Sequence, residues 1–246
     1  MTKKKANKVL LTGDGRRFLV EDTGKDFHTQ LGFVKKKDLQ KAGSMAETNK
    51  GDRVAVLKPC FADLYSRLKR HAQIITPKDM GMIAASTGIN KSSFVVDLGS
   101  GSGALACFLA SIAKKVMTYD LDERSMAATK KNIDLLGLKN IKAVKKDCYQ
   151  GIEETNADVI TMDLPEPWRA LESAGKALKT GGFLVNYSPH ITQSQRLVNE
   201  AESAGFIHLK TIELIQREWV VEGKKARPDF RGLGHTGFLT FMRKFE

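Results

Sequence analysis

Two regimes of hydrophobic and polar patterning divide the chain. Up to about residue 60 the apolar segments are short, and Gly and Asp turn residues separate them. The strands expected there are VLLTG, RRFLVED, FHTQLGFV and DRVAVLKP. We therefore expect a small β module over residues 1–65, followed by a larger domain over residues 66–246.

From about residue 78 onward, buried-strand patterns alternate with amphipathic-helix patterns. The expected strands are SFVVD (93–97), KVMTYD (115–120), IKAVKKD (141–147), ADVITMD (157–163) and GFLVNYS (182–188). The expected helices are GALACFLASIA (103–113), ERSMAATKKNIDLLG (123–137), PWRALESAGKALKTG, closing at Gly181, and ITQSQRLVNEAESAG, closing at Gly205. This alternation predicts an α/β fold with a doubly wound, Rossmann-like sheet.

The end of the chain breaks the alternation. Residues 206–221 and 235–244 are two strand-like runs with no helix pattern between them. The predicted sheet therefore has seven strands and finishes with an antiparallel hairpin.

The net charge of +12 is concentrated near the N-terminus. Residues 1–75 contain 17 Lys and Arg against 8 Asp and Glu, whereas the remainder contains 23 against 20. A basic module beside a nearly neutral domain favours a polyanionic partner, nucleic acid first, over a merely solubilising surface. Candidates for phosphate contacts are Arg67, Lys69, Arg70 and the run Lys35–Lys37.

Cysteine usage and hydropathy bear on location. Cys60, Cys107 and Cys148 lie far apart without a Cys-x-x-Cys pair, so we expect no metal site and a reducing, cytoplasmic compartment. No apolar run approaches the ~20 residues of a membrane span. The basic start MTKKKANK lacks the apolar stretch of a signal peptide.

A glycine loop follows the first strand of the larger domain. It comprises Asp97, Leu98, Gly99, Ser100, Gly101, Ser102 and Gly103, and a predicted helix comes next. Glycines let the backbone approach a ligand closely, and the start of the helix faces that ligand. The loop alone does not separate a dinucleotide from S-adenosylmethionine (AdoMet).

Acidic residues at three strand ends favour AdoMet. Asp97 stands directly before the glycines, where it would repel a diphosphate but attract the AdoMet cations. Asp120, beside Leu121, is placed to accept the ribose hydroxyls of either ligand. Asp147 is placed to accept from an adenine amino group, with Cys148 lining the ring. Taken singly, Asp97 would be a helix cap and Asp147 a turn residue. Together with the terminal hairpin, the set resembles class I AdoMet-dependent methyltransferases.

A fourth acid, Asp163, ends the strand ADVITMD and opens the segment DLPEPW. Ligands of doubly wound sheets sit at the carboxyl ends of the strands, so Asp163 should face the reacting group. Pro165 and Pro167 should give this loop a rigid shape. For Trp168 we favour packing in the core over stacking on a base.

Four segments in the same order resemble the tRNA (adenine-N1)-methyltransferase family that modifies the T-loop. They are DLPEPW, RHAQIITPKD (70–79), NYSPHITQ (186–193) and RPDFRGLGHTGFLTFMRK (227–244). The family pattern after the second strand differs here. Asp120 is shorter than the usual Glu, Asp122 occupies the usual Arg position, and Arg124 is displaced.

The resemblance implies transfer of a methyl group from AdoMet to N1 of a T-loop adenosine, by a cytoplasmic homotetramer that binds tRNA. It implies that Asp163 is catalytic, contacts AdoMet and accepts a hydrogen bond from the adenine amino group. It adds Gln73 as an AdoMet contact and Pro165, Tyr187 and His235 as substrate contacts.

Two alternatives stay open from the sequence. One is a class I methyltransferase acting on a protein isoaspartyl group or a small molecule, which the glycine loop allows. The other is a non-catalytic tRNA-binding subunit, which should have lost the glycine loop or Asp163, whereas this chain keeps both. An NAD-dependent enzyme is disfavoured by Asp97.

Overall fold

The computed structural model describes residues 7–70 and 73–246. The chain forms two compact units. One consists of Met1–Lys69 together with Lys130–Lys139, and the other of Arg70–Thr129 and Asn140–Glu246.

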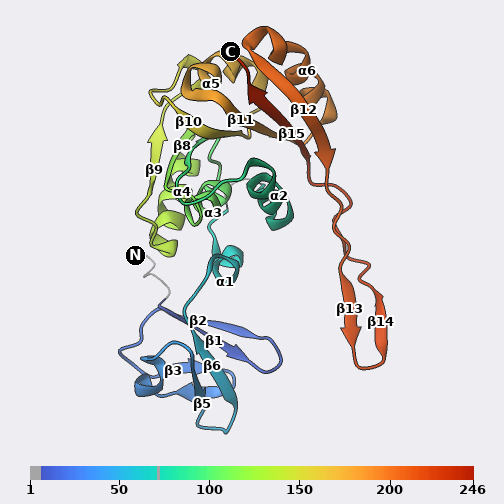
Figure 1. The fold of residues 1–246 in the computed structure, drawn as a ribbon. Helices are drawn as coiled ribbons and strands as arrows, with labels where there is room; N and C mark the ends of the chain where they lie inside the picture. The colour runs from blue at the N-terminus through green and yellow to red at the C-terminus, as the bar shows by residue number, and fades with distance from the viewer. Residues whose placement is uncertain (1–6, 71–72) are drawn as a thin grey trace. The chain divides into compact units, whose positions relative to one another are not determined.

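The N-terminal unit contains a four-stranded antiparallel sheet of order β2-β1-β6-β5 and a separate hairpin, β3-β4 (Figure 1). Its elements are β1 Lys8–Thr12, β2 Arg17–Val20, β3 Phe27–Thr29, β4 Gly32–Val34, η1 Lys36–Leu39, β5 Ser44–Glu47, β6 Arg53–Leu57, α1 Phe61–Leu64 and η2 Tyr65–Arg67. The apolar residues Leu10, Val20, Val34, Leu39 and Val56 are completely buried in its core.

The structure of this unit differs from the sequence analysis in one wrong expectation and one missed strand. FHTQLGFV is a hairpin rather than one strand, because Gly32 has φ +103° and turns the chain. The strand β5 (Ser44–Glu47) was not expected, since Ser, Ala and Glu do not favour strands; pairing with β6 stabilises it.

The larger unit contains the predicted seven-stranded sheet, of order β12-β15-β11-β10-β7-β8-β9. Its strands are β7 Phe94–Leu98, β8 Lys115–Asp120, β9 Ile141–Lys145, β10 Ala157–Met162, β11 Leu178–Ser188, β12 Phe206–Glu213 and β15 Phe238–Lys244. All neighbours pair in parallel except β15, which is antiparallel to both β11 and β12. The α/β fold with a terminal antiparallel hairpin is confirmed.

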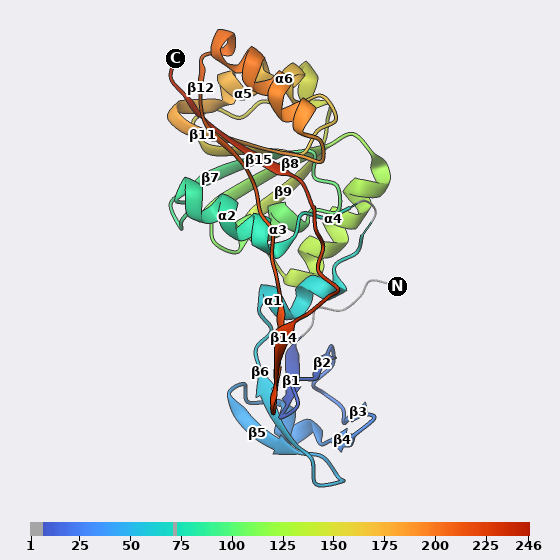
Figure 2. The same ribbon diagram turned by 90° about the vertical axis from the view of Figure 1, so that its right-hand side faces the viewer.

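Helices cover both faces of this sheet, α2, α3 and α4 on one side and α5 and α6 on the other (Figure 2). The helices are α2 Pro77–Thr87, α3 Ala104–Ala110, α4 Glu123–Leu136, α5 Leu171–Ala177 and α6 Ile191–Ala201, with short 3-10 segments at η3 Cys148–Gln150, η4 Pro167–Ala170 and η5 Glu202–Ala204. No helix in residues 7–70 and 73–246 is long and apolar enough to cross a membrane.

The predicted helix end at Gly181 is wrong, whereas the end at Gly205 is confirmed. Helix α5 stops at Ala177, because Leu178 is buried and pairs with Ala157 of β10 as the first residue of β11. The second helical segment ends as expected at Gly205, which has the left-handed φ of +79°.

The run over residues 206–221 is also not one strand. Strand β12 ends at Glu213, and β13 (Trp219–Glu222) pairs with β14 (Lys225–Pro228) as a separate hairpin. Figure 1 shows this hairpin extending well beyond the ends of β12 and β15. The connection between the last two sheet strands is therefore itself a structured ribbon.

Candidate active site at the carboxyl ends of the strands

The glycine loop is held tightly between two neighbouring strand ends. The amide groups of Gly99 and Ser100 donate to the carbonyl oxygen of Tyr119, at 2.9 and 2.8 Å. Gly99 has φ +90°, and a Cβ there would collide with the backbone carbonyl of Asp163. Gly103 has φ +72° and has no space for a Cβ beside the side chain of Thr129. Both positions therefore require glycine.

A narrow pocket of about 20 Å³ lies over this loop. Its lining residues are Gln73, Ile74, Ile75, Asp97, Gly99, Ser100, Gly101, Ser102, Ala104, Leu105 and Asp163. The structure thus brings together Gln73, the glycine loop with Asp97, and Asp163 from three separate parts of the sequence. Leu98, by contrast, is completely buried inside the sheet.

Asp97 is buried in the middle of the sheet. Its carboxylate accepts hydrogen bonds from the hydroxyl groups of Thr118 on β8 (2.6 Å) and Thr161 on β10 (2.7 Å). Burial raises the pKa of Asp97 to about 6; the two hydrogen bonds oppose that rise and the charge of Asp120 adds to it. Asp97 therefore anchors the two neighbouring strands as well as lining the pocket.

Asp120 connects the second strand to the glycine loop. One carboxylate oxygen accepts from the Gly101 amide at 2.8 Å and from the Ser100 hydroxyl at 3.3 Å. The other accepts from the Asp122 amide at 2.8 Å. Leu121, next in the chain, is 62% exposed.

Asp122 explains the departure from the family pattern after this strand. Its side chain accepts from the backbone amides of Arg124 (2.8 Å) and Ser125 (2.9 Å), at the start of α4. It also forms an ion pair with the Arg124 guanidinium at 3.2 Å. These hydrogen bonds lower the pKa of Asp122 to about 2. A helix cap thus occupies the position where the family usually has Arg.

At the third strand end, Asp147 and Cys148 lie outside the lining of the narrow pocket. The Asp147 side chain accepts from the Tyr149 amide at 3.0 Å and caps η3. Cys148 is buried, and burial followed by the charge of Asp147 raises its pKa to about 11. Cys148 is therefore an uncharged thiol that provides an apolar surface.

Asp163 differs from the other acids of the site. Its amide donates to the carbonyl oxygen of Leu98 at 2.9 Å, which fixes its backbone. Within residues 7–70 and 73–246, its half-buried carboxylate receives no hydrogen bond from another side chain. Burial, and then the charges of Asp97 and Asp120, raise the pKa of Asp163 to about 7. An unpaired acid beside two others favours a cationic ligand.

The loop after Asp163 is held by neighbouring helices. The carbonyl oxygen of Pro165 accepts from the Gln193 side chain at 2.9 Å. Trp168 packs against the hydrophobic core, and the Arg196 guanidinium lies 4.0 Å from the centre of its indole ring. These contacts agree with packing as the role of Trp168.

The two other substrate candidates meet in the loop before β15. Tyr187 is buried, and its hydroxyl donates to the carbonyl oxygen of Thr236. His235 is exposed, with Nδ1 2.5 Å from Glu213 and Nε2 3.0 Å from the carbonyl oxygen of Pro189. These two acceptors, Glu213 first, raise the pKa of His235. Neither residue lines the narrow pocket.

One cluster was missed from the sequence. Asp79 is completely buried and accepts from Lys78 (2.8 Å), Thr76 (2.7 Å) and Thr236 (3.1 Å). Three of these residues are in TPKD at the start of α2, a pattern typical of a solvent-exposed helix start. The burial of Asp79 depends in part on its contact with the distant Thr236. Nothing in the sequence relates Thr236 to Asp79.

Comparison with known sequences finds relatives over most of the chain. Residues 52–229 match the family model of the tRNA methyltransferase complex GCD14 subunit. The chain is 33% identical to the tRNA (adenine(57)-N(1)/adenine(58)-N(1))-methyltransferase TrmI of Methanocaldococcus jannaschii, over 97% of this chain and 95% of that protein. It is also 33% identical to the tRNA (adenine(58)-N(1))-methyltransferase TrmI of Thermus thermophilus, over 94% of each chain.

Two solved structures resemble the whole chain. The tRNA (m1A58) methyltransferase TrmI from Aquifex aeolicus superposes with a TM-score of 0.79 at 26% identity, covering both chains completely. A SAM-dependent O-methyltransferase from Thermotoga maritima superposes with a TM-score of 0.83 at 27% identity, covering all of this chain and 95% of the other.

The close approach at Gly99 generates a prediction. In Gly99→Ala, the new methyl group meets the Asp163 carbonyl at a backbone angle that alanine adopts at a cost of about 1–2 kcal/mol. We expect the affinity for AdoMet, measured by isothermal titration calorimetry, to fall at least about tenfold. Gly101→Ala is the matched control, because its φ is +51° but a Cβ there meets nothing within 4 Å. Equal AdoMet affinity in the two variants would contradict this role of Gly99.

Proposed function

This chain belongs to the family of the GCD14 subunit of the tRNA methyltransferase complex, and we propose that it transfers a methyl group from AdoMet to N1 of a T-loop adenosine of tRNA, of the 57/58 type. The observation that carries this proposal is Asp163. It is an unpaired carboxylate, fixed beside the glycine loop at the strand end where the reacting base would lie.

The residues of the pocket fit AdoMet. When bound, AdoMet supplies an electrophilic methyl group and brings positive charge on its sulfonium and ammonium groups. The charge of Asp120 adds to the cost of ionising Asp97, and the charges of Asp97 and Asp120 add to that of Asp163, so a cation would relieve both costs. A dinucleotide would add a diphosphate to the same three carboxylates. We propose that the glycine loop and Gln73 contact AdoMet, with Asp120, Leu121, Asp147 and Cys148 forming the nucleoside side.

Asp163 has a distinct task in the proposed reaction. Adenine N1 has a free lone pair at neutral pH, so no strong base is needed. The enzyme must extrude the base and orient it. The Asp163 carboxylate would accept a hydrogen bond from the exocyclic amino group and stabilise the positive charge that develops on the ring. Guanine has a carbonyl at that position, which the carboxylate would repel. Rate and base selectivity thus depend on one residue.

The second solved neighbour favours one competing activity. Its description as an O-methyltransferase shows that this fold also accompanies other acceptors. Incubation of the chain with radiolabelled AdoMet and tRNA, followed by digestion to nucleosides, separates the two. Labelled 1-methyladenosine supports our proposal. Label in a ribose-methylated nucleoside, or none in tRNA, would exclude it.

In the same assay, Asp163→Asn tests the mechanism. We expect kcat to fall by about 10²–10³-fold, the scale for one electrostatic contact in a transition state, with AdoMet binding retained. Because the pKa of Asp163 is raised to about 7, kcat/KM of the wild type should decline as the pH falls below 7 and the carboxylate is protonated. This acidic limb should be absent from the residual activity of the variant. Full activity of Asp163→Asn would remove the residue from the mechanism.

We propose that the basic N-terminal unit binds tRNA. The side chains of Lys35, Lys36 and Lys37 are all exposed at the start of η1, where they are free to approach phosphates. Arg67 and Lys69 lie at the end of the first segment of this unit. Arg70 begins the other unit. With tRNA as its substrate, we also propose a cytoplasmic location for the protein.

Replacing Lys35, Lys36 and Lys37 together by Gln tests this role. We expect weaker tRNA binding and a slope of log Kd against log salt that decreases by about one for each lysine contacting a phosphate. AdoMet binding should not change. The control replaces Lys91, Lys114 and Lys142, which are equally exposed on the other unit. The same loss in both triple variants would indicate general electrostatics instead of a binding site.

The β13-β14 hairpin supports the proposal of a homotetramer. Trp219 pairs with Pro228, and Val221 pairs with Ala226, so these four apolar side chains share one face of the ribbon. Trp219 is 58% exposed and Val221 79% exposed in the single chain. A two-stranded ribbon with an uncovered apolar face is marginal by itself, and packing against other copies would stabilise it.

A charge in this face tests the assembly. In Val221→Lys we expect the molar mass measured by light scattering to fall from a multiple of the chain mass toward that of a smaller species, because a buried lysine is costly. Glu222→Lys is the control, since Glu222 pairs with Lys225 on the opposite face. A wild-type chain that is monomeric in solution would exclude the tetramer.

A further inference from the structure

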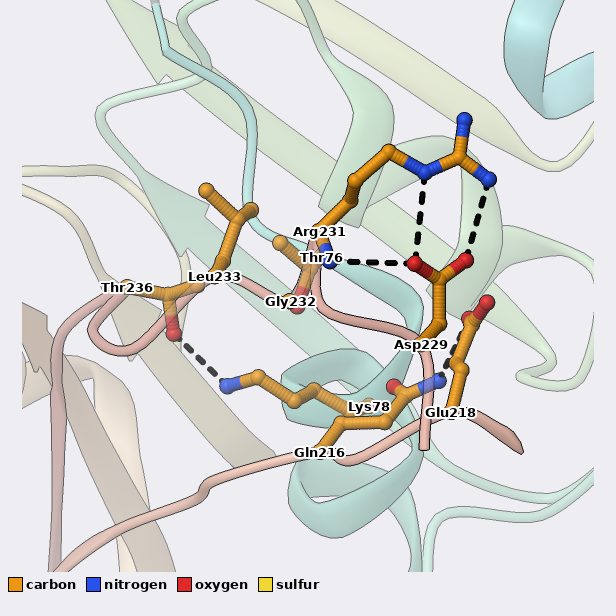
Figure 3. Close-up of a pocket in the computed structure, with 9 residues that line it drawn as sticks. All are labelled: Thr76, Lys78, Gln216, Glu218, Asp229, Arg231, Gly232, Leu233 and Thr236. Atoms are coloured by element: carbon orange, nitrogen blue, oxygen red, sulfur yellow. Dashed lines mark hydrogen bonds and ion pairs between the residues drawn. The ribbon is translucent and has the colours of Figure 1, made fainter. Parts of the chain in front are cut away.

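A second pocket, of about 220 Å³, lies beside the candidate active site. Figure 3 shows its lining, which consists of Thr76, Lys78, Gln216, Glu218, Asp229, Arg231, Gly232, Leu233 and Thr236. The chain segment Gln73–Lys78 separates the two pockets, because Gln73 and Ile75 line the narrow pocket and Thr76 and Lys78 line this one. A ligand of one pocket is therefore a close neighbour of a ligand in the other.

Lys78 provides a fixed hydrogen-bond donor in one wall of this pocket. The Lys78 ammonium donates to Asp79 at 2.8 Å and to Thr236 at 2.7 Å, and its side chain is only 13% exposed. Asp79, completely buried, neutralises its charge and also accepts from Thr76 and Thr236. An ammonium has three N–H groups, so one remains for a ligand. The network holds this donor in place without leaving net charge in the pocket.

The other wall offers acceptors. The Gln216 amide group donates to the Glu218 carboxylate at 3.1 Å, which orients the Gln216 carbonyl oxygen and leaves it available. Arg231 donates to Asp229 at 3.0 and 3.2 Å, and these bonds lower the pKa of Asp229, so that this pair is ionised and mutually satisfied (Figure 3). Leu233, 64% exposed, adds an apolar surface.

This combination selects one kind of ligand. A phosphate would face the carboxylates of Glu218 and Asp229, and the two cations of the pocket are already paired with acids. A purely apolar group would leave the nearly buried Lys78 donor without a partner for its third N–H, which is costly. A nucleobase has an edge that both donates and accepts, and faces that pack against an aliphatic side chain.

We propose that this pocket receives the base of a tRNA nucleotide adjacent to the methylated adenosine. Lys78 donates to an acceptor atom on the edge of that base, and Gln216 and Glu218 accept from its donors. The inference rests on the proposed function. It assigns to the stretch between β12 and β15 the recognition of sequence next to the target, whereas Asp163 recognises the target itself.

Combining an enzyme variant with altered tRNA transcripts tests this pocket. Wild-type enzyme and Gln216→Ala are assayed with intact tRNA and with transcripts that carry an abasic nucleotide at each of the two positions on either side of the target. For wild type we expect one abasic position to lower kcat/KM about tenfold, the scale of one or two hydrogen bonds. Gln216→Ala should lose part of that tenfold on intact tRNA and should match wild type on that abasic transcript, because the missing base leaves Gln216 without a partner.

A matched pair of glutamates controls for general effects. Glu218→Gln should behave like Gln216→Ala, whereas Glu222→Gln, four residues further on and outside the pocket, should match wild type. AdoMet affinity should be unchanged in all three variants. If the losses in kcat/KM caused by Gln216→Ala and by the abasic position multiply when combined, the pocket assignment is overturned. The same holds if no abasic position affects wild type. In both cases methylation of tRNA would still stand. Absence of 1-methyladenosine with wild type would overturn the proposed function and this inference together.

Discussion

The site depends on the cost of gathering like charges at one edge of a sheet. Asp97, Asp120 and Asp163 lie at or beside the carboxyl ends of three strands that are neighbours in the sheet. Threonine hydroxyls satisfy the first and loop amides the second. The Asp163 carboxylate receives neither kind of hydrogen bond, so the free-energy cost of ionising it is not offset. A cationic cofactor and an amino group of the substrate are the two ligands that would relieve it.

The backbone makes this arrangement rigid. The glycine loop approaches the Asp163 carbonyl so closely that no side chain fits at position 99, and the same loop donates to Asp120. The narrow pocket and Asp163, the residue proposed to be catalytic, are therefore held together by the backbone. A shift of the loop would move the carboxylate with it, and positioning is most of what methyl transfer to a free lone pair requires.

Fold similarity does not decide the reaction. One solved neighbour is described as a tRNA (m1A58) methyltransferase and another, with a higher TM-score, as an O-methyltransferase. What supports the proposed base methylation in this chain is local: an acid without a side-chain partner, a loop in which Pro167 begins η4, and a polar pocket on the other side of segment 73–78. Function is thus argued from the site.

The sequence by itself determined the features that repeat over short distances. Alternating strand and helix patterns, the glycines and the acids that follow the strands were sufficient to predict the seven-stranded sheet and the region where the glycine loop and Asp163 meet, whereas Gln73 was expected only from the family resemblance. Local patterns carry this information because parallel strands bring their carboxyl ends to one edge.

Only the tertiary structure decided the features that depend on partners far away in the chain. Leu178 leaves its helical pattern because it pairs with β10. Asp79 looks like an exposed residue of a helix start, yet Thr236, 157 residues later, helps to bury it. The β13-β14 hairpin interrupts the run over residues 206–221, which has the local pattern of one strand. In each case contacts between residues far apart in the chain override the local preference. Because the energy of such contacts depends on distant partners, the neighbouring residues in the sequence do not reveal it.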